Sequence, residues 1–245
     1  MRLDGLVSKL NIGTRSEAKK YIKAGKIKVN GVINKDPSSS VNEEDEIEYN
    51  GKVYIYQKFV YYMLNKPKGC VSATKDNDTT VINVFLEAYK RKYGEDLINL
   101  PVDEMFPMGR LDKDTVGLLI ITNDGEMSHK LLSYKYHVEK KYYAELDGPL
   151  SDDVIKALEN GVTIEEGVVT KPAKVEPVPN SNACYITICE GKYHQVKRMF
   201  EKMFLKVTYL KRVSFGGLKL DEELREGDIR KLNENEIEIL KRGLI

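Results

Sequence analysis

The strongest pattern of apolar positions lies in the middle of the chain. From Val116 to Ile121 every residue is apolar or glycine, several are β-branched, and Asn123-Asp124-Gly125 ends the run. This composition predicts a strand that is buried on both faces. The loop before it brings four charged side chains to the end of that strand, where a rigid element would fix their geometry: Arg110, Asp112, Lys113 and Asp114. The alternative interpretation of these residues is a solvated turn with internal ion pairs.

Apolar positions at helical spacing open the chain and predict a first helix: Leu3, Leu6, Val7 and Leu10. Asn11-Ile12-Gly13 breaks that pattern, and Thr14 with Glu17 forms a capping-box signature for a second helix that ends at Gly25. Residues 26–33 and 48–56 each hold an Asn-Gly pair between alternating residues, which is the signal of a β-hairpin. The first 56 residues therefore predict two short helices and two hairpins.

Strand and helix patterns follow one another through the rest of the chain. The sequence predicts strands at 59–64, 141–146, 183–189 and 207–213, and further strands within 162–178 with Pro172 at an edge or bend. It predicts helices at 81–96, 123–133, 151–160 and 235–242. Residues 101–108 predict a loop, and residues 190–204 predict a turn followed by a helix.

Size and composition narrow the class of protein. The chain has 245 residues, of which 41% are hydrophobic and 31% charged, so it has room for one medium domain and one small one. No apolar run is long enough to span a bilayer, and the first ten residues do not read as a signal peptide. Three cysteines without Cys-x-x-Cys spacing and three scattered histidines predict neither a disulfide framework nor a metal site. We therefore expect a cytoplasmic protein that uses no metal or other cofactor.

The net charge of +1 argues against a protein that is basic all over, but the charges are unevenly distributed. Residues 1–35 hold nine Lys or Arg against two acids, residues 36–50 hold six acids and no base, and residues 192–212 hold seven Lys or Arg against Glu201. Two basic segments in a nearly neutral chain predict two places where phosphates could be neutralised, although such runs are usually solvated faces.

Four strings in the second part of the chain resemble one enzyme family. Gly109-Arg-Leu-Asp112, followed by Asp114-Thr-x-Gly-Leu-Leu119, resembles the catalytic motif of the RNA pseudouridine synthases, in the subgroup that includes the ribosomal small-subunit enzyme. Leu64-Asn-Lys-Pro-Lys-Gly69 is similar to the opening of the family's catalytic domain, and Glu139-Lys-Lys-Tyr142 resembles its Lys-x-Tyr motif. Residues 190–200, Glu-Gly-Lys-Tyr-His-Gln-Val-Lys-Arg-Met-Phe, resemble a string of the small-subunit synthase itself.

This resemblance implies the roles of three residues. Asp112 matches the catalytic aspartate, Tyr142 the tyrosine that stacks on the target base, and Lys197 a position that arginine occupies in other branches of the family. Lys197 would then keep Asp112 charged beside the base, as a flexible point charge rather than a bidentate fork. Tyr142 and Lys197 would otherwise be read as an ordinary core tyrosine and a solvated lysine.

The N-terminal segment resembles the small α-L RNA-binding domain first known from a ribosomal protein. Gly13-Thr-Arg-Ser-Glu-Ala18 and Ile22-Lys-x-Gly-Lys-Ile-Lys-Val-Asn-Gly31 carry that likeness, which covers most of residues 1–48. The resemblance implies a cationic face for RNA, where an ordinary basic surface is the alternative. Its members would be Arg15, Lys19, Lys20, Lys23 and Lys28.

Further RNA contacts are expected in the second domain. Arg110, next to Asp112, would hold the everted nucleotide or fill the vacated stack. The other expected contacts, several of them to backbone phosphates, are Lys66, Lys68, Lys192, His194, Gln195, Arg198 and Arg212.

Together these resemblances imply an α+β protein with an α-L RNA-binding domain at 1–58 and a catalytic domain at 59–245 on a mostly antiparallel mixed sheet flanked by helices. The implied activity is isomerisation of a specific uridine in small-subunit ribosomal RNA, by a monomer acting on that RNA or on an assembling particle. The alternatives are a large-subunit ribosomal RNA synthase and a non-catalytic ribosome-assembly factor. The second alternative is disfavoured because Asp112 is present.

Overall fold

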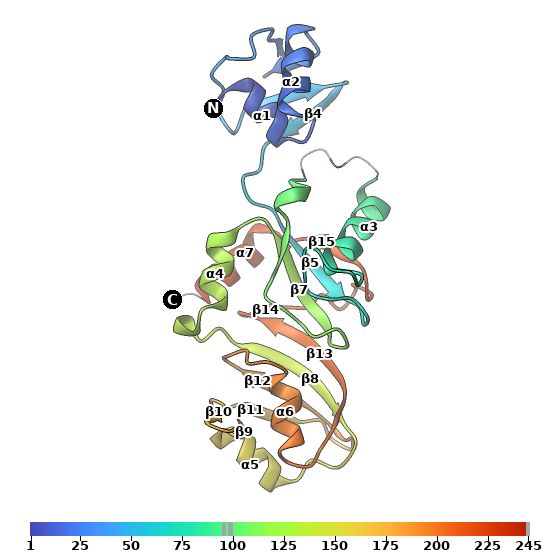
Figure 1. Ribbon diagram of the computed structural model, residues 1–245, viewed down its shortest axis with the longest axis vertical. Coiled ribbons are helices and arrows are strands. Elements are labelled where there is room, and N and C mark those ends of the chain that lie inside the picture. The colour runs from blue at the N-terminus through green and yellow to red at the C-terminus, as the bar shows by residue number, and fades with distance from the viewer. Residues whose placement is uncertain (95–96, 98–99, 244–245) are drawn as a thin grey trace. The chain divides into compact units, whose positions relative to one another are not determined.

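The computed structural model describes residues 1–94, 97 and 100–243 (Figure 1). The chain divides into two units, one formed by Met1–Val60 with Tyr89–Met105 and the other by Tyr61–Ala88 with Phe106–Ile245.

The first unit contains two short helices and a small antiparallel sheet. Helix α1 spans Leu3–Lys9 and α2 spans Arg15–Lys23, and the sheet has the order β2-β1-β3-β4. Its strands are β1 (Ile27–Val29), β2 (Val32–Ile33), β3 (Glu46–Tyr49) and β4 (Lys52–Ile55). A 3₁₀ turn at Val102–Glu104 also belongs to this unit.

Local signals in the sequence explain how these elements form. Thr14 accepts a hydrogen bond from the backbone of Glu17, and the Glu17 carboxylate accepts one from the backbone of Thr14, so the predicted capping box is confirmed. Both Asn-Gly pairs have positive φ at both residues, 50° and 80° at Asn30 and Gly31, as tight hairpin turns require. The core beneath the helices is apolar: Leu3, Leu6, Val7, Leu10, Ile12, Ala18, Ile22, Ile27, Val41, Ile47 and Tyr54.

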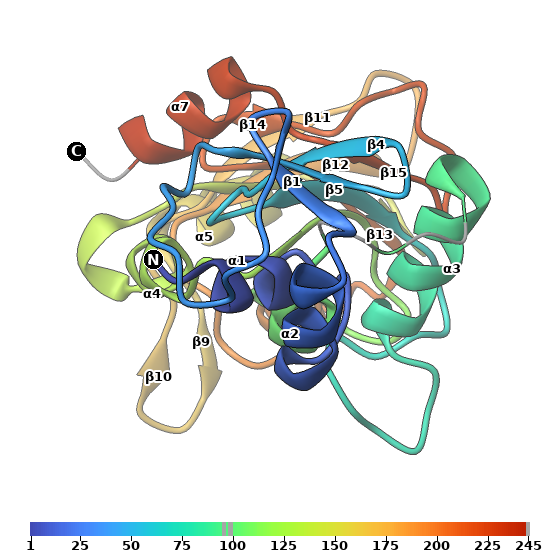
Figure 2. The ribbon, with the colours of Figure 1, turned by 90° about the horizontal axis from the view of Figure 1, so that it is seen from above.

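The second unit is built on a mixed sheet. Its described strands follow the order β11-β12-β8-β13-β7-β5-β15, with β14 paired to β13 and β6 to β7. Among these strands only β7 and β13 run parallel, so the expected mostly antiparallel sheet is confirmed. The bounds are β5 (Tyr61–Lys66), β6 (Phe106–Met108), β7 (Val116–Thr122), β8 (Lys140–Leu146), β11 (Lys174–Pro177), β12 (Ala183–Ile188), β13 (Val207–Phe215), β14 (Leu218–Lys219) and β15 (Ile229–Lys231). A separate hairpin of β9 (Thr163–Glu165) and β10 (Val168–Val169) stands clear of this sheet in Figure 2.

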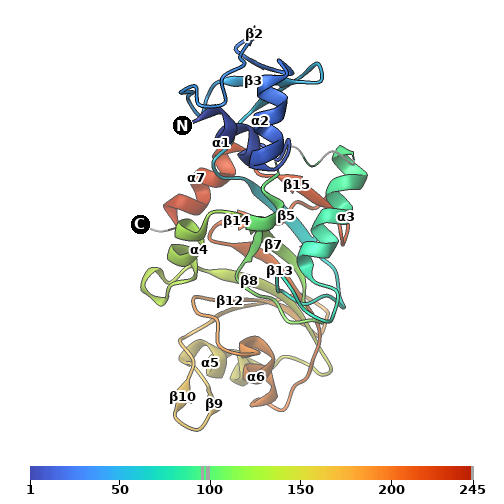
Figure 3. The ribbon, with the colours of Figure 1, turned by 45° about the horizontal axis from the view of Figure 1, so that its top comes forward.

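Helices cover both faces of the sheet. Figures 1 and 3 show α4 (Gly125–Leu132) and α7 (Glu234–Arg242) on one side of β5 and β7 and α3 (Val81–Tyr93) on the other. Alternation along β5 explains this, since Tyr61 and Met63 join the core beneath α4 and α7 while Tyr62 packs against Phe85 of α3. Helices α5 (Asp152–Asn160) and α6 (Gln195–Glu201) lie by the β11–β12 end, and a 3₁₀ turn spans Tyr134–Tyr136.

All seven residues of β7 are buried, which confirms the strand predicted from the apolar run. The loop predicted at 101–108 is wrong at its end, because Phe106–Met108 pairs with β7. The predicted helix end at residue 204 is wrong, because α6 ends at Glu201. Phe204 has a φ of 58°, which is incompatible with a right-handed helix. Strands β14 and β15 were not predicted; each is two or three residues long and is defined by its partner strand. Residues 95 and 96 of the predicted helix 81–96 lie outside the described residues.

Candidate active site

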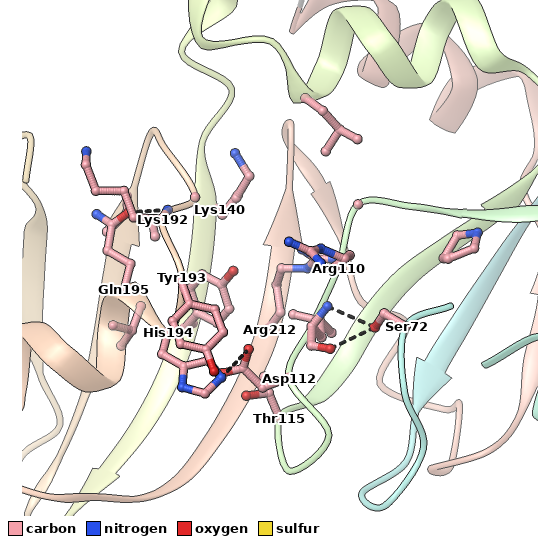
Figure 4. A pocket seen from close by; sticks show the side chains of 18 of the residues that line it. Ser72, Arg110, Asp112, Thr115, Lys140, Lys192, Tyr193, His194, Gln195 and Arg212 are labelled. Carbon is pink, nitrogen blue, oxygen red and sulfur yellow. Dashed lines mark hydrogen bonds and ion pairs between the residues drawn. The ribbon is translucent and has the colours of Figure 1, made fainter. Parts of the chain in front are cut away.

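A pocket of about 830 Å³ opens in the second unit, over the middle of the sheet. Three neighbouring strands form its floor, which consists of Ile188 of β12, Lys140 and Tyr142 of β8, and Leu210 and Arg212 of β13. Its walls come from residues 71–76, 107–115, 132–134 and 189–197. Figure 4 shows Asp112 and Thr115 on one wall, Tyr193 and His194 on another, and Arg212 and Lys140 on the strands between them.

The loop that carries Asp112 is fixed by backbone hydrogen bonds on both sides. The Ser72 hydroxyl donates to the carbonyl oxygen of Leu111 at 2.8 Å and accepts from its N–H at 3.0 Å. The ammonium group of Lys66 donates to the carbonyl oxygen of Thr115 at 2.9 Å. Gly109, with a φ of +84°, begins the turn. Asp112 is thus held by its main chain before any ligand binds, as a reacting group requires.

The side chain of Asp112 forms an ion pair across the pocket. Its Oδ2 accepts a hydrogen bond from Lys197 Nζ at 3.0 Å, and Lys197 also donates to Asp114 Oδ1 at 2.5 Å. The Lys197 side chain is 17% exposed and that of Asp112 28%, so the pair is shielded from solvent without being closed off. The ammonium group is shared between two carboxylates, in keeping with the expectation that lysine would not form a bidentate pair here.

The two carboxylates also set the protonation of Lys197. Burial alone would lower the pKa of Lys197, but its hydrogen bonds to Asp114 and Asp112 raise that pKa above the usual range. Burial alone would likewise raise the pKa of Asp114, but the hydrogen bond from Lys197 lowers it. Lys197 therefore stays a cation over the whole physiological range.

His194 and Tyr193 form the wall opposite Asp112. The His194 Nε2 atom lies 3.5 Å from Asp112 Oδ1, an ion pair when His194 is protonated (Figure 4). His194 is in the left-handed region, with a φ of 49°, which costs a residue with a side chain about 1–2 kcal/mol. Its ring stacks on Tyr193 with centroids 3.9 Å apart, and Tyr193 is 72% exposed. This strained turn holds an aromatic face at the rim of the pocket.

A buried hydrogen-bond network shapes that turn. The Gln195 amide donates to Glu190 Oε1 at 2.8 Å, and its oxygen accepts from the backbone of Lys192 at 2.9 Å. Lys192 pairs with the other oxygen of Glu190. Burial would raise the pKa of Glu190, but its hydrogen bonds from Lys192, the Lys171 backbone and Gln195 lower it.

Tyr142 and Arg212 face each other across two strands. Tyr142 of β8 pairs in register with Arg212 of β13, and both side chains are buried in the floor of the pocket. Arg212 is 2% exposed, and its Nε donates to the carbonyl oxygen of Leu118 at 2.7 Å. Burial lowers the pKa of Arg212, while the neighbouring Tyr142 hydroxyl partly offsets that lowering.

Three of the side chains predicted to contact RNA are buried. Lys66 is fully buried and donates to backbone carbonyl oxygens, so it supports the Asp112 loop. Gln195 is buried in the Glu190 network. Arg212 lies in the floor of the pocket and is 2% exposed. Charged and amide side chains are rarely buried, so the sequence alone predicted that these three side chains are exposed.

The other predicted contacts fall into three groups. Arg110, Lys192 and His194 line the pocket, and Arg110 is exposed. Lys68 is exposed outside the pocket, and Arg198 bonds Glu165 and the carbonyl oxygen of Ile164. In the first unit, four of the predicted cations are exposed on α2: Arg15, Lys19, Lys20 and Lys23. Arg15 and Lys19 lie within 4.0 Å of the buried Asp4. The fifth, Lys28, pairs with Glu48 at 2.7 Å.

The prediction missed several residues of the pocket. Tyr193 and Lys140 both lay in the strings that carried the family resemblance, so a signal for them was present. Ser72 carried no such signal, because its role comes from a hydrogen bond to residue 111, far away in the sequence.

In the described part of the chain no group of three or more His, Cys, Asp and Glu side chains is arranged to hold a metal ion. None of the helices described there is long and apolar enough to cross a bilayer.

The arrangement suits chemistry at a carbon that develops positive charge. A carboxylate fixed at the pocket wall can stabilise such a carbon, attack it or remove a proton beside it. A tyrosine in the floor offers a flat face to a planar ring.

The chain is similar to known RNA pseudouridine synthases. Residues 60–202 match the family described as RNA pseudouridylate synthase, and residues 1–47 match the S4 domain. The chain is 41% identical to an uncharacterized RNA pseudouridine synthase of Bacillus subtilis over 244 residues, 98% of each chain. It is 39% identical to ribosomal small subunit pseudouridine synthase A of Haemophilus influenzae, covering 98% of this chain and 99% of that one, and 36% identical to ribosomal large subunit pseudouridine synthase B of Bacillus subtilis, covering 98% and 95%.

A crystal structure described as a pseudouridylate synthase aligns with 98% of this chain and 99% of its own, at 37% identity and a TM-score of 0.66. The S4 domain is the small RNA-binding domain expected at the N-terminus. The chain therefore belongs to the RNA pseudouridine synthase family and is an isomerase with an N-terminal S4 RNA-binding domain.

Proposed function

We propose that the enzyme isomerises one uridine of small-subunit ribosomal RNA and that Asp112 is the carboxylate that acts on the ribose. The observation that carries this proposal is the Asp112–Lys197 pair, 3.0 Å long, on the wall of a pocket whose floor holds Tyr142. The pocket is the place where a nucleotide turned out of its stack could meet a carboxylate and an aromatic ring together.

The chemistry requires an ionised carboxylate at the sugar. When the bond between the anomeric carbon and N1 breaks, positive charge builds on the ribose. Asp112 stabilises that charge, attacks the anomeric carbon or removes a neighbouring proton. Lys197 supports the ionised form of Asp112 while a base covers it and excludes water, because an ammonium group 3.0 Å away offsets the loss of solvation.

Tyr142 provides the surface that receives the uracil ring. Stacking of a base on an aromatic side chain contributes about 1–3 kcal/mol, which is comparable with the few kcal/mol that eversion of the nucleotide costs. Arg110, exposed at the rim, holds the everted nucleotide or fills its place in the stack. Lys192 and His194 on the opposite wall, and Lys68 outside the pocket, contact the flanking backbone.

The two domains have different functions. Residues 1–58 bind RNA through the cationic face of Arg15, Lys19, Lys20, Lys23 and Lys28, and residues 59–245 perform the isomerisation. A target in small-subunit RNA is supported by the resemblance of residues 193–198 to the small-subunit synthase and by the 39% identical small-subunit relative. A uridine of large-subunit RNA is the second candidate, because the large-subunit synthase of Bacillus subtilis is 36% identical over nearly the same length.

Substitution of Asp112 tests the catalytic role. Asp112→Asn should reduce tritium release from RNA labelled at C5 of uracil by at least about a thousandfold while leaving RNA affinity nearly unchanged. Asp114→Asn is the matched control, since it removes the other carboxylate that shares Lys197, and it should retain much more activity. Full activity of Asp112→Asn would end the assignment.

The target is tested in cells. Pseudouridine is mapped across all ribosomal RNA with and without the protein, and again with the Asp112→Asn variant restored. One small-subunit uridine should remain unmodified in its absence. A missing modification in large-subunit RNA would favour the second candidate.

A further inference from the structure

Two cations lie in the floor of the pocket, on the strands rather than on the walls. Arg212 is 2% exposed and Lys140 9%. In the described part of the chain neither side chain has a carboxylate within 4.0 Å, in contrast to Lys197, which has two. Glu190, whose charge acts on Lys140, is already engaged by Lys192, Gln195 and the Lys171 backbone.

The guanidinium group of Arg212 is only partly satisfied by the protein. Its Nε donates to the carbonyl oxygen of Leu118, and its central carbon lies 5.1 Å from the centre of the Phe215 ring. Its Nη2 atom is buried and has no hydrogen-bond partner among the described residues. Arg212 lines the pocket and is paired in register with Tyr142, so a base on Tyr142 would lie next to this side chain.

Lys140 contacts the same aromatic ring as Arg212. Its Nζ donates to the carbonyl oxygen of Val138 at 3.0 Å and lies 5.7 Å from the same Phe215 ring. Burial, and then repulsion from Arg212, lowers the pKa of Lys140 to about 8. Buried charges without a counterion are unfavourable, so two of them side by side in a pocket indicate that negative charge appears there during the reaction.

We propose that Arg212, supported by Lys140, is a further catalytic residue that stabilises the negative charge developing on the uracil ring. The inference rests on the proposed function, which puts the base on Tyr142. When the bond from the anomeric carbon to N1 breaks, its electron pair stays on the base and spreads over N1, O2 and O4. C5 of that anion then forms the new bond to the anomeric carbon, the proton on C5 leaves to water, and N1 takes up a proton.

Different residues therefore stabilise the two fragments that separate, the ribose and the uracil base. Asp112 acts on the cationic sugar from the wall, and Nη2 of Arg212 donates to an oxygen of the anionic base from the floor. A donor that is fixed in place before the charge develops contributes more than a mobile one, because little reorganisation is needed. The β8–β13 pairing and the bond to Leu118 fix Arg212 in this way.

The leaving group can be changed to test the proposal. In RNA that carries 5-fluorouridine at the target, fluorine withdraws electron density and makes the base anion more stable. Arg212→Met should slow single-turnover conversion of uridine by about 10²–10³-fold, and should slow conversion of 5-fluorouridine at least about tenfold less. With uridine the product is pseudouridine. With 5-fluorouridine no proton can leave C5 after the new bond forms there, so water adds across the C6=N1 bond, and the product is the hydrated 5-fluoro nucleoside linked through C5. Both products are measured by nuclease digestion and mass spectrometry. The RNA affinity should change less than about threefold.

Lys211→Met is the matched control. It removes the same charge from the next residue of β13, whose side chain alternates to the other face and does not line the pocket. It should convert both substrates at the wild-type rate. Equal slowing of both substrates by Arg212→Met would show that Arg212 only maintains the fold. A loss of affinity and of salt dependence with an unchanged conversion rate would show that it binds a phosphate instead.

A second pair of variants covers the case in which Arg212→Met does not fold. Arg212→Lys keeps a charge but loses the fork of donors, and Lys140→Met leaves Arg212 in place. Both should show the same preference for 5-fluorouridine with a smaller loss, and equal losses on both substrates would overturn the proposal. Asp112→Asn should be inactive on both substrates, so failure of the proposed function is recognised separately.

Discussion

At the scale of single residues, the pocket contains two kinds of cation. Lys197 on the wall has carboxylate partners, whereas Lys140 and Arg212 in the floor have none among the described residues. Lys197 lies between Asp112 and Asp114, which raise its pKa. Lys140 has no carboxylate within 4.0 Å among the residues that the structure describes, and its burial, together with Arg212, lowers its pKa to about 8. The first arrangement keeps a charge permanently in place, whereas the second leaves a positive site that a transient anion can neutralise.

The lowered pKa of Lys140 has a consequence for stability. An unfolded lysine has a pKa near 10.4, so between about pH 8 and 10.4 the unfolded chain binds more protons than the folded one. Stability contributed by this group therefore rises with pH in that window and is constant below it. Relative to Lys140→Met, the free energy of unfolding of the wild type should rise by on the order of 2–3 kcal/mol between pH 7.5 and 10.5.

Urea unfolding at a series of pH values measures this difference. The other titratable groups that face Lys140 are Arg212 on β13 and Cys189 and Glu190 after β12, and all three are retained in Lys140→Met. Lys211→Met, measured in parallel, corrects for general alkaline unfolding. A difference between wild type and Lys140→Met that does not vary with pH would contradict the interpretation of Lys140 as a buried group without a counterion.

At the scale of elements, β7 and β13 determine where the pocket floor lies. They are parallel neighbours, and Gly117 of β7 is paired with Arg212 of β13. Gly117 has a φ of +103°, and a Cβ atom there would collide with the Arg212 carbonyl oxygen and lie 2.8 Å from its nitrogen. The glycine thus allows the close approach of the two strands at the residue proposed to face the base.

Gly117→Ala should therefore destabilise the protein by about 3 kcal/mol or more, because both the positive φ and the approach of β13 oppose a side chain. Thermal or urea unfolding measures the loss. Gly125→Ala is the matched control: Gly125 begins α4, and a Cβ atom there meets nothing within 4 Å. It should be neutral or stabilise by up to about 1 kcal/mol. Similar stability of the two variants would contradict the close approach.

Elements with local signals were predictable from the sequence, and those defined by distant partners were not. The capping box of Thr14 and Glu17, the two Asn-Gly turns and the apolar run of β7 each depend on residues next to one another. Strands β6, β14 and β15 exist because a longer strand lies beside them. The burial of Lys66 and Arg212 likewise follows from carbonyl groups that the fold brings to them.

The same distinction applies to the pocket. The family motifs in the sequence predicted Asp112, Tyr142 and Lys197 as site residues. The structure adds the distance between Lys197 Nζ and Asp112 Oδ2, which is 3.0 Å. The sequence could not give the sharing of Lys197 with Asp114 or the unused donor of Arg212, since both depend on side-chain geometry across the sheet.

At the scale of the whole molecule, a chain of net charge +1 places its excess positive charge in separate segments. Four basic residues of the S4 domain are exposed on α2, away from the apolar core beneath that helix: Arg15, Lys19, Lys20 and Lys23. In residues 192–212, Arg198 is paired with Glu165 and Lys197 with Asp112, and Arg212 is buried. We therefore expect the S4 domain to supply most of the salt-dependent affinity and the second domain to supply the chemistry.

Charge reversal on α2 tests this division. Changing Lys19, Lys20 and Lys23 to Glu should weaken RNA binding and reduce the slope of log affinity against log salt by roughly 0.7–0.9 for each phosphate that the variant no longer neutralises. The single-turnover rate at saturating RNA should stay within about twofold of wild type, since none of the three residues lines the pocket. The same lysines changed to Arg keep the charge and should keep the slope, and thermal unfolding verifies that both variants fold. An unchanged slope in the Glu variant would place the electrostatic contribution elsewhere on the protein, and a lower saturating rate would mean that the S4 domain also takes part in catalysis.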